Sequence, residues 1–260
     1  MDFQTIFDEL SEVIRGTKLL IDYYNDKSSL KSTIYGCIDW AGSAPQDREL
    51  VEKKFINVNL PQKVYFNSQY LILCASYENF IISFLKCILL KISETKDFSK
   101  IPHALRNINT SYSGSLLSSI TGEKKSHVRF KTEDLIKNLY LLNSKDNSFK
   151  LNIEIAELVP SVLLFEKVID FIQKCDLEIG WTDITDNTIF KDEYKGNKTE
   201  RKNIAVNMHK DIYRIRNRIA HTGCSSAVVI GELEDLLKFL TPFNKSLINV
   251  VETEINKVYL

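Results

Sequence analysis

Apolar residues recur along much of this chain every three to four positions, which is the spacing of an amphipathic α-helix. The longest apolar stretch, residues 64–92, is hydrophobic on most faces and predicts a central helix with little contact to water. Shorter stretches with one apolar face predict further helices at residues 3–24, 28–40, 160–175, 201–221, 226–240 and 241–258. Thr241 and Pro242 are expected to open the last of these as N-cap and first helical residue. The pattern predicts an all-α protein.

The segments between these helices are polar or contain turn residues. We expect irregular structure at residues 41–46, at 93–130 with a loop at 111–115, and at 181–197. Residues 149–156 differ, because apolar and polar residues alternate there. That alternation predicts a short β-strand or hairpin arm, although the start of a helix also fits.

The composition agrees with a helical domain. The chain has 260 residues but only 9 glycines and 5 prolines, too few helix breakers for a protein of many short strands. This length suffices for one sizeable hydrophobic core. We expect a single helical domain over residues 1–260, in which an N-terminal helical extension (1–60) precedes a core at 61–258.

The cysteines and the N-terminus indicate a cytoplasmic protein. The five cysteines lack the spacing of zinc ligands or of a redox dithiol, so buried free thiols in a reducing compartment are expected. The first residues do not resemble a signal peptide. Residues 70–90 are long enough to span a bilayer, but Glu78, Asn79 and Lys86 would be costly in lipid. We therefore expect no membrane association.

The side-chain charges balance, with 34 basic and 34 acidic residues. A protein that coats nucleic acid usually has a basic excess, so any such contact must be local. The segment from Lys191 to Arg218 is rich in lysine and arginine and could attract phosphate; a solvated helix face is the alternative interpretation.

The helix predicted at 201–221 carries the most specific chemistry, in the run Arg216-Asn217-Arg218-Ile219-Ala220-His221. One face of this helix is apolar and consists of Ile204, Met208, Ile212, Ile215 and Ile219. Arg216 and His221 lie on either side of the polar face, with Tyr213 and Asn217 between them. Helix fraying or a second copy of the helix could close the gap between them. The offset suggests a homodimer with a site on its two-fold axis.

An arginine and a histidine suit RNA cleavage that needs no metal. A histidine can move the protons of the 2′-hydroxyl and of the leaving 5′-oxygen near neutral pH. The arginine fork can hold the phosphate oxygens through two hydrogen bonds. His209, Arg214, Arg218 and Tyr213 on the same helix are candidate RNA contacts, although a packed or solvated role is the simpler interpretation for His209.

The run from Arg216 to Gly223 resembles the R-x(4–6)-H motif of the HEPN superfamily of ribonucleases. Asn217 matches the polar residue that commonly follows the arginine in that family. Residues 73–80, LCASYENF, are similar to the first core helix of the RiboL-PSP and MAE-type HEPN subgroups, in which A-x-x-E-x-F recurs, here at 75–80. The resemblance covers residues 64–256 and implies a HEPN-like helical bundle.

The resemblance implies roles for particular residues. Arg216, His221 and Asn217 would be catalytic without a cofactor, and Glu78 would face the motif helix and orient Arg216 or His221. A carboxylate in so apolar a helix needs a partner; a place at the helix surface or at a dimer seam is the alternative for Glu78.

The implied function is an endoribonuclease acting as a toxin or anti-phage defence effector, with RNA and a controlling antitoxin or defence protein as partners. HEPN toxins paired with a nucleotidyltransferase often carry a tyrosine where this chain has Gly223, which argues against that type of antitoxin. Two alternatives are a HEPN-fold binding or assembly module without catalysis, and a helical scaffold in which Arg216 and His221 are structural.

Overall fold

The structure, a computed structural model, describes residues 2–40, 62–95, 97–121, 131–222 and 227–259. Most of these residues are helical, and none of them forms a β-strand, so the all-α prediction is confirmed. The α-helices are α1 (Phe3–Trp40), α3 (Gln62–Ser93), α4 (His103–Thr121), α5 (Thr132–Asn143), α6 (Phe165–Lys174), α7 (Trp181–Thr185), α8 (Thr188–Glu193), α9 (Lys198–Thr222) and α10 (Ile230–Tyr259). Two 3₁₀ helices, η2 (Phe98–Lys100) and η3 (Ile153–Leu158), lie between them.

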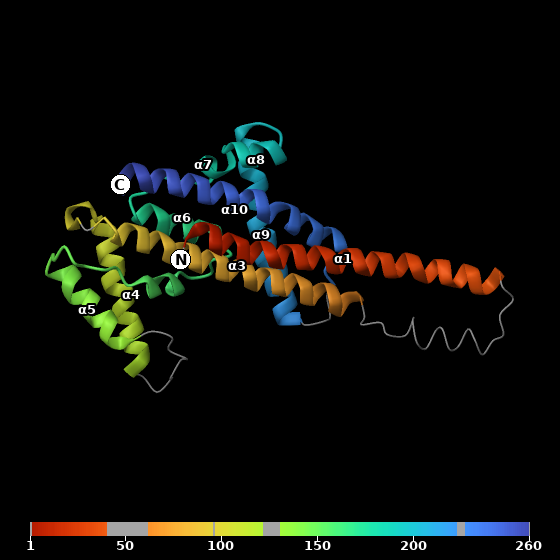
Figure 1. Ribbon diagram of the computed structural model, residues 1–260, viewed down its shortest axis with the longest axis horizontal. Coiled ribbons are helices and arrows are strands. Elements are labelled where there is room, and N and C mark those ends of the chain that lie inside the picture. The colour runs from red at the N-terminus through yellow and green to blue at the C-terminus, as the bar shows by residue number, and fades with distance from the viewer. Residues whose placement is uncertain (1, 41–61, 96, 122–130, 223–226, 260) are drawn as a thin grey trace.

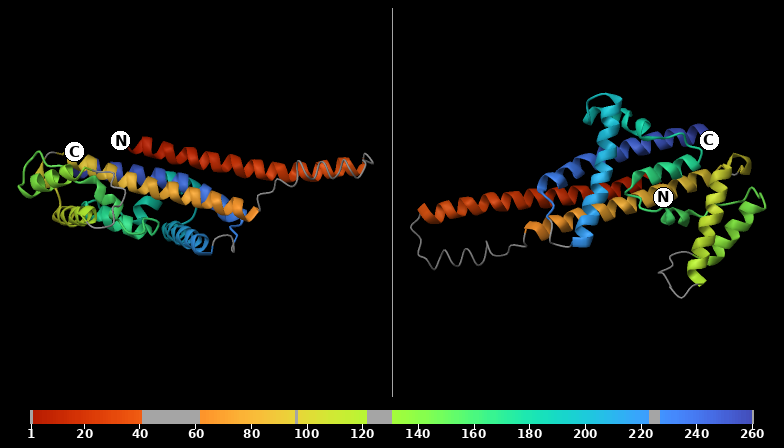
Figure 2. Two further views of the ribbon diagram at one scale, coloured as in Figure 1. Left: turned by 90° about the horizontal axis from the view of Figure 1, so that it is seen from below. Right: turned by 180° about the vertical axis from the view of Figure 1, so that it is seen from behind.

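Three long helices, α1, α3 and α10, lie side by side and form the body of the molecule (Figure 1). The helix α1 runs opposite to the other two, and its second half extends beyond the beginning of α3 (Figures 1 and 2). The first half of α1 joins the main core through Phe3, Ile6, Phe7 and Leu10. The N-terminal segment is therefore packed against the core rather than attached to its edge.

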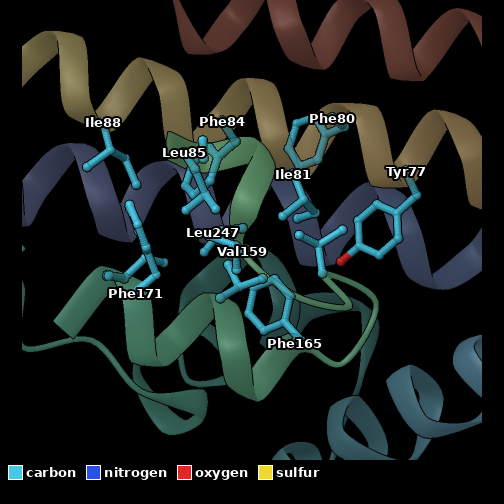
Figure 3. Packing of buried hydrophobic residues seen from close by; sticks show 14 of the residues in the cluster. Tyr77, Phe80, Ile81, Phe84, Leu85, Ile88, Val159, Phe165, Phe171 and Leu247 are labelled. Atoms are coloured by element: carbon cyan, nitrogen blue, oxygen red, sulfur yellow. The ribbon is translucent and has the colours of Figure 1, made fainter. Parts of the chain in front are cut away.

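The helix α3 is the centre of the core, as its apolar sequence predicted. Its side chains face α6, α10 and the segment before α6 (Figure 3). The residues of this cluster include Tyr77, Phe80, Ile81, Phe84, Leu85 and Ile88 of α3 with Val159, Phe165, Phe171 and Leu247. Burying each such side chain contributes roughly 1.5–3 kcal/mol, so α3 stabilises the fold more through packing than through helix propensity.

By length and composition, α3 is also the one helix among the described residues that could cross a membrane. Half of its apolar window is buried inside the protein. A central core helix passes the same test, so the length and composition of α3 do not decide between the two environments.

The helix α9 crosses the layer of long helices and contacts α3, α7 and α10 (Figure 2). Its buried side chains include Ala205, Ile212, Ile215 and Ile219. Ile212, Ile215 and Ile219 of the predicted apolar face are buried, whereas Ile204 and Met208 are only partly buried. The helix α9 packs against α3, as expected. This contact brings the segment from Arg216 to His221 at the end of α9 next to α3.

A small group of elements, α4, α5 and η3, packs at the end of the molecule where α3 ends (Figure 1). Its centre is Asn152, whose side-chain nitrogen donates to the Ser113 hydroxyl over 2.8 Å and to the Leu135 carbonyl over 3.2 Å. Asn138 donates to the side-chain oxygen of Asn152 over 2.9 Å, and Asn109 donates to its backbone carbonyl over 3.3 Å. Buried amides thus connect all three elements.

The irregular region predicted at 93–130 is wrong, because α4 occupies its middle. One face of α4 is buried and consists of Leu105, Asn109, Ser113 and Leu116. Two of these four residues are polar, so the sequence of α4 does not show apolar residues at helical spacing. The expected loop at 111–115 lies inside this helix.

The β-strand or hairpin predicted at 149–156 is also wrong. The chain is irregular up to Asn152, and η3 begins at Ile153. The alternation arises because Phe149 and Leu151 are buried while Lys150 is exposed. A strand needs a neighbouring strand for its hydrogen bonds, and the described part of the chain offers none.

Several predicted helix boundaries differ from the structure. The segments 3–24 and 28–40 form one helix, α1, and 181–197 contains the short helices α7 and α8. The segments 226–240 and 241–258 form one helix, α10, with Pro242 in its interior. Proline removes one helical hydrogen bond, but buried residues on both sides, Phe239, Leu240, Phe243 and Leu247, hold the helix together. The turn predicted at 41–46 lies outside the described residues.

Candidate active site

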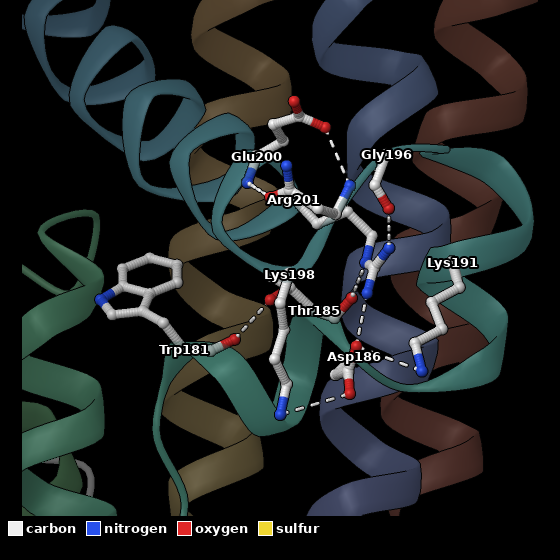
Figure 4. Close-up of polar contacts among 9 residues, drawn as sticks. Trp181, Thr185, Asp186, Lys191, Gly196, Lys198, Glu200 and Arg201 are labelled. Atoms are coloured by element: carbon white, nitrogen blue, oxygen red, sulfur yellow. Dashed lines mark hydrogen bonds and ion pairs between the residues drawn. The ribbon is translucent and has the colours of Figure 1, made fainter.

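The beginning of α9 is fixed by the buried side chain of Arg201 (Figure 4). Its Nε donates to the Thr185 carbonyl over 3.0 Å, and its terminal nitrogens bind the Gly196 carbonyl and the Asp186 carboxylate. Lys191 and Lys198 also pair with Asp186, at 3.1 and 3.5 Å. These hydrogen bonds, with that of Lys191 first, lower the pKa of Asp186. The network joins α9 to α7 and α8.

The middle of α9 is fixed by His209, which is buried among aromatic rings. The rings nearest to it belong to Phe165, Trp181, Phe239 and Phe243. Its Nδ1 lies 2.9 Å from the Ala205 carbonyl and its Nε2 lies 2.8 Å from the Tyr77 hydroxyl. A carbonyl only accepts, so Nδ1 carries the proton and Nε2 accepts from Tyr77.

Burial lowers the pKa of His209 to about 4, so the ring is neutral at pH 7. The side chain is only 1% exposed and cannot reach a bound RNA. The RNA contact considered for His209 is therefore wrong, and the packed role that its sequence context also allowed is correct. The helical periodicity of α9 alone does not predict that His209 is buried, because the rings around it come from other helices.

The structure brings Glu78 of α3 and Arg216 of α9 together. The Nε atom of Arg216 lies 3.6 Å from Oε1 of Glu78, and both side chains are partly exposed. On its other side Arg216 donates from a terminal nitrogen to the Asn217 side-chain oxygen over 3.2 Å. The guanidinium is held in one orientation by groups from two helices, while its second terminal nitrogen has no partner among the described residues.

Cys74 lies one turn before Glu78 on α3 and is buried. Burial, and to a smaller extent the charge of Glu78, raises the pKa of its thiol to about 12. A thiol with this pKa is protonated at neutral pH and is a poor nucleophile. Cys74 therefore belongs to the core beneath the site. Cys87 and Cys175 are buried as well, as the sequence predicted for them.

His221 is exposed in the last turn of α9, and no described residue lies within hydrogen-bond distance of it. The helix stays regular through Thr222. Five residues of regular helix rotate the chain by about 140° beyond one full turn, so Arg216 and His221 leave the helix in different directions. The described helix therefore does not bring Arg216 and His221 together within one chain.

The other candidate RNA contacts occupy different environments. Arg214 is exposed and pairs with Asp211 at 2.9 Å. Arg218 is partly buried and lies 3.4 Å from the Glu232 carboxylate. Tyr213 packs its ring partly against the core. Arg214 is thus the most accessible of the three, whereas Arg218 connects α9 to α10.

Glu232 was not predicted from the sequence as part of this region. Its carboxylate accepts a hydrogen bond from the backbone N–H of Val229 over 3.0 Å and also pairs with Arg218. A glutamate three residues after the N-cap residue, here Val229, is a recognisable capping signal, which could have identified Glu232. Through this one carboxylate the last turns of α9 and the first turn of α10 are held together.

Three cavities lie elsewhere in the molecule, and Arg216 and His221 line none of them. The largest, of about 890 Å³, is lined by residues of α5 and of the segment 147–154 together with the end of α3. The described residues contain no cluster of His, Cys, Asp and Glu that could hold a metal ion. In the candidate site itself, His221 is exposed and Arg216 is partly exposed at the end of α9.

Comparison with protein families, with curated proteins and with solved structures finds no match for this chain. The geometry at the end of α9 and the motif residues themselves are what bear on its function.

Proposed function

We propose that this protein is an endoribonuclease that cleaves RNA without a metal, with Arg216 and His221 as catalytic residues. The observation that carries the proposal is the position of the Arg216 guanidinium between Glu78 and Asn217, at the same helix end that exposes His221 in another direction. Two ionisable groups of complementary chemistry are thus presented to solvent at one helix end. The resemblance of this segment to the HEPN motif supports the same assignment.

In the proposed reaction the 2′-hydroxyl of RNA attacks the adjacent phosphorus and the bond to the 5′-oxygen breaks. One imidazole accepts the proton of the 2′-hydroxyl, and a second, protonated imidazole donates a proton to the leaving 5′-oxygen. The products carry a 2′,3′-cyclic phosphate and a 5′-hydroxyl. Because each chain supplies one His221, two chains are needed for both proton transfers, which agrees with the directions of Arg216 and His221 on one helix.

Arg216 would stabilise the phosphorane that forms between attack and departure. Its Nε side faces Glu78 and one terminal nitrogen is bound to Asn217, so the remaining N–H groups are available to the phosphate oxygens. Glu78 acts as a positioning residue, because it contacts Arg216 rather than the RNA. A guanidinium oriented in advance stabilises developing charge more than a mobile one does.

The setting we propose is a cytoplasmic toxin or anti-phage defence effector, kept inactive by a partner protein until it is needed. The neutral overall charge fits an enzyme that contacts RNA over a small surface, since a basic coat would bind nucleic acid everywhere. The exposed Arg214, near the motif on α9, is the local group best placed to attract the RNA backbone.

The test is cleavage of RNA by the purified full chain in the presence of EDTA, with the products analysed by mass spectrometry. We expect cleavage that leaves 2′,3′-cyclic phosphate ends, and its loss in His221→Ala. A strict requirement for Mg²⁺ would overturn the mechanism. Binding of RNA without any cleavage would favour the alternative of a binding module, and neither binding nor cleavage would favour a structural role for the motif.

A further inference from the structure

A cavity between the beginning of α4 and the end of α5 carries a cluster of unpaired basic groups. It has a volume of about 180 Å³. His103 and Arg106 of α4 line it together with Lys145, which follows α5. The described residues of its lining include no acidic side chain. We propose that this cavity binds a small phosphate ester. This proposal does not depend on the ribonuclease assignment.

Arg106 is held in place without a counterion. Its guanidinium carbon lies 4.8 Å from the centre of the Phe98 ring, which supports one face of the group. Its Nε is buried and has no hydrogen-bond partner among the described residues. A buried guanidinium N–H without an acceptor is costly, so this arrangement indicates a site for an anion.

His103 adds a hydrogen-bond donor to the cavity. Its Nδ1 lies 3.2 Å from the side-chain nitrogen of Asn107. Because an amide nitrogen can only donate, Nδ1 is the acceptor and the neutral ring carries its proton on Nε2. That Nε2–H has no partner in the described part of the chain and can donate to an oxygen of the ligand.

Lys145 lies in the left-handed region of the backbone, with a φ of 57°. It occupies the position after the end of α5, where the N–H of Asp146 bonds to the Leu141 carbonyl over 3.1 Å and closes the helix. Glycine is favoured at this position, because it has no side chain to strain the conformation. The chain has lysine there instead, and this exposed residue is part of the lining of the cavity.

The chemistry of the lining selects a phosphate group. Arg106 and Lys145 supply two positive charges, which match the nearly doubly charged phosphate monoester at pH 7. Asn107 and Asn143 supply neutral hydrogen-bonding groups around them. The cavity is smaller than the roughly 300–1,000 Å³ of sites for drug-sized ligands. Its size therefore favours a phosphorylated sugar over a larger molecule.

The cavity is separate from the candidate active site. The helices α4 and α5 pack where α3 ends, whereas α9 crosses α3 nearer its middle (Figures 1 and 2). None of the residues that line it contacts Arg216, Glu78 or His221 in an ion pair or hydrogen bond. A ligand there would bind without occupying the proposed RNA site.

The experiment is calorimetric titration of the full chain with ribose 5-phosphate, with unphosphorylated ribose as the matched probe. We expect ribose 5-phosphate to bind and ribose not to bind. The Lys145→Gly variant should weaken binding by about tenfold or more, the effect of losing one charge-assisted hydrogen bond. It should also unfold at the same or a higher temperature, since glycine relieves the left-handed backbone, so lost binding cannot be attributed to misfolding.

Two controls define the site. Lys137→Ala removes the same charge from α5, but Lys137 lines the neighbouring cleft, so binding should change by less than about threefold. His221→Ala should bind ribose 5-phosphate as the parent does. Equal binding by Lys145→Gly, equal binding of ribose, or no binding of ribose 5-phosphate would overturn the proposal. Binding confined to RNA with a 5′-phosphate and lost in Lys145→Gly would overturn the small-ligand assignment.

Discussion

The Tyr77 hydroxyl donates a hydrogen bond to Nε2 of His209 over 2.8 Å, and both side chains are buried. This bond connects the centre of α3 to the middle of α9. Burial raises the pKa of Tyr77 well above its ordinary value and lowers that of His209 to about 4, so both groups are neutral at pH 7. Because protonation of His209 would place a charge in this buried contact, the packing of α9 against α3 depends on pH.

The protein should lose stability as the pH falls from about 6.5 towards 4. An unfolded chain protonates its histidine below pH 6.5, whereas folded His209 stays neutral until about pH 4, so the unfolded state binds more protons in this window. The full effect is up to roughly 3 kcal/mol. Urea unfolding of the parent and of His209→Gln at pH 6.5 and pH 5 measures it. An equally steep loss in the variant would contradict this origin.

The catalytic prediction concerns the two motif residues. His221→Ala and Arg216→Ala should each reduce RNA cleavage by on the order of a hundredfold or more, because one removes the proton-transfer group and the other removes the phosphate fork. Both variants should unfold near the parent temperature, since His221 is exposed and Arg216 is partly exposed. Initial rates on a labelled RNA, with Lys167→Ala on α6 as an exposed control outside the site, test this. Full activity in His221→Ala would refute the assignment.

The Glu78→Gln substitution should reduce activity more than stability. It removes the ion pair with Arg216 but keeps the size of the side chain, and pairs this exposed contribute at most about 1 kcal/mol. We expect a loss of kcat with a nearly unchanged unfolding temperature. Glu78→Asp, which restores the charge at a shorter reach, should recover part of the activity. A parallel loss of activity and stability would instead point to a role in folding.

The dimer prediction can be tested by mixing variants. Parent protein is mixed with a large excess of His221→Ala chains, so that most parent chains pair with an inactive partner. If the site contains residues from two chains, the cleavage rate per parent chain should fall. Light scattering should show a dimer at micromolar concentration. If the parent activity is unchanged by the excess, or if a monomer is fully active, each chain holds a complete site.

Arg201 should matter for stability far more than its neighbour Lys198. Arg201→Ala leaves two carbonyls without their donor and removes one of the three cations that bind Asp186 in a partly buried place, and losses of about 3 kcal/mol are typical of such changes. Lys198 is 62% exposed and pairs with the same Asp186, so Lys198→Ala should cost less than about 1 kcal/mol. Urea unfolding curves compare the two. An equal loss of unfolding free energy in the two variants would show that the hydrogen bonds of Arg201 to the two carbonyls add nothing to its charge.

The sequence predicted the elements whose packing follows the hydrophobic pattern. The helices α3 and α9 were found because Phe84 or Ile212 and their neighbours are both apolar and buried. The helix α4 was missed because Asn109 and Ser113 are polar and buried, so its stripe carries no hydrophobic signal. Pro242 suggested a helix start but lies within α10, since tertiary packing outweighs one lost hydrogen bond.

The residues of the candidate site were predictable in type but not in arrangement. The motif spacing identified Arg216 and His221, and the apolar surroundings of Glu78 indicated that it needs a partner. The contact of Glu78 with Arg216 depends on how α9 crosses α3, which a single sequence does not specify. The burial of His209 likewise follows from aromatic rings on α6, α7 and α10, which are distant in the chain.

The hydrogen bonds of Asn152 determine the register of α4 and α5. An apolar interface could slide by one helical turn and bury nearly the same area, whereas Asn152 finds Ser113, Leu135 and Asn138 together in a single alignment. Any other alignment would leave several buried amides without acceptors, which is costly. Asn152 therefore contributes to the uniqueness of the native arrangement more than to its total stability. It makes other alignments of α4 and α5 unfavourable.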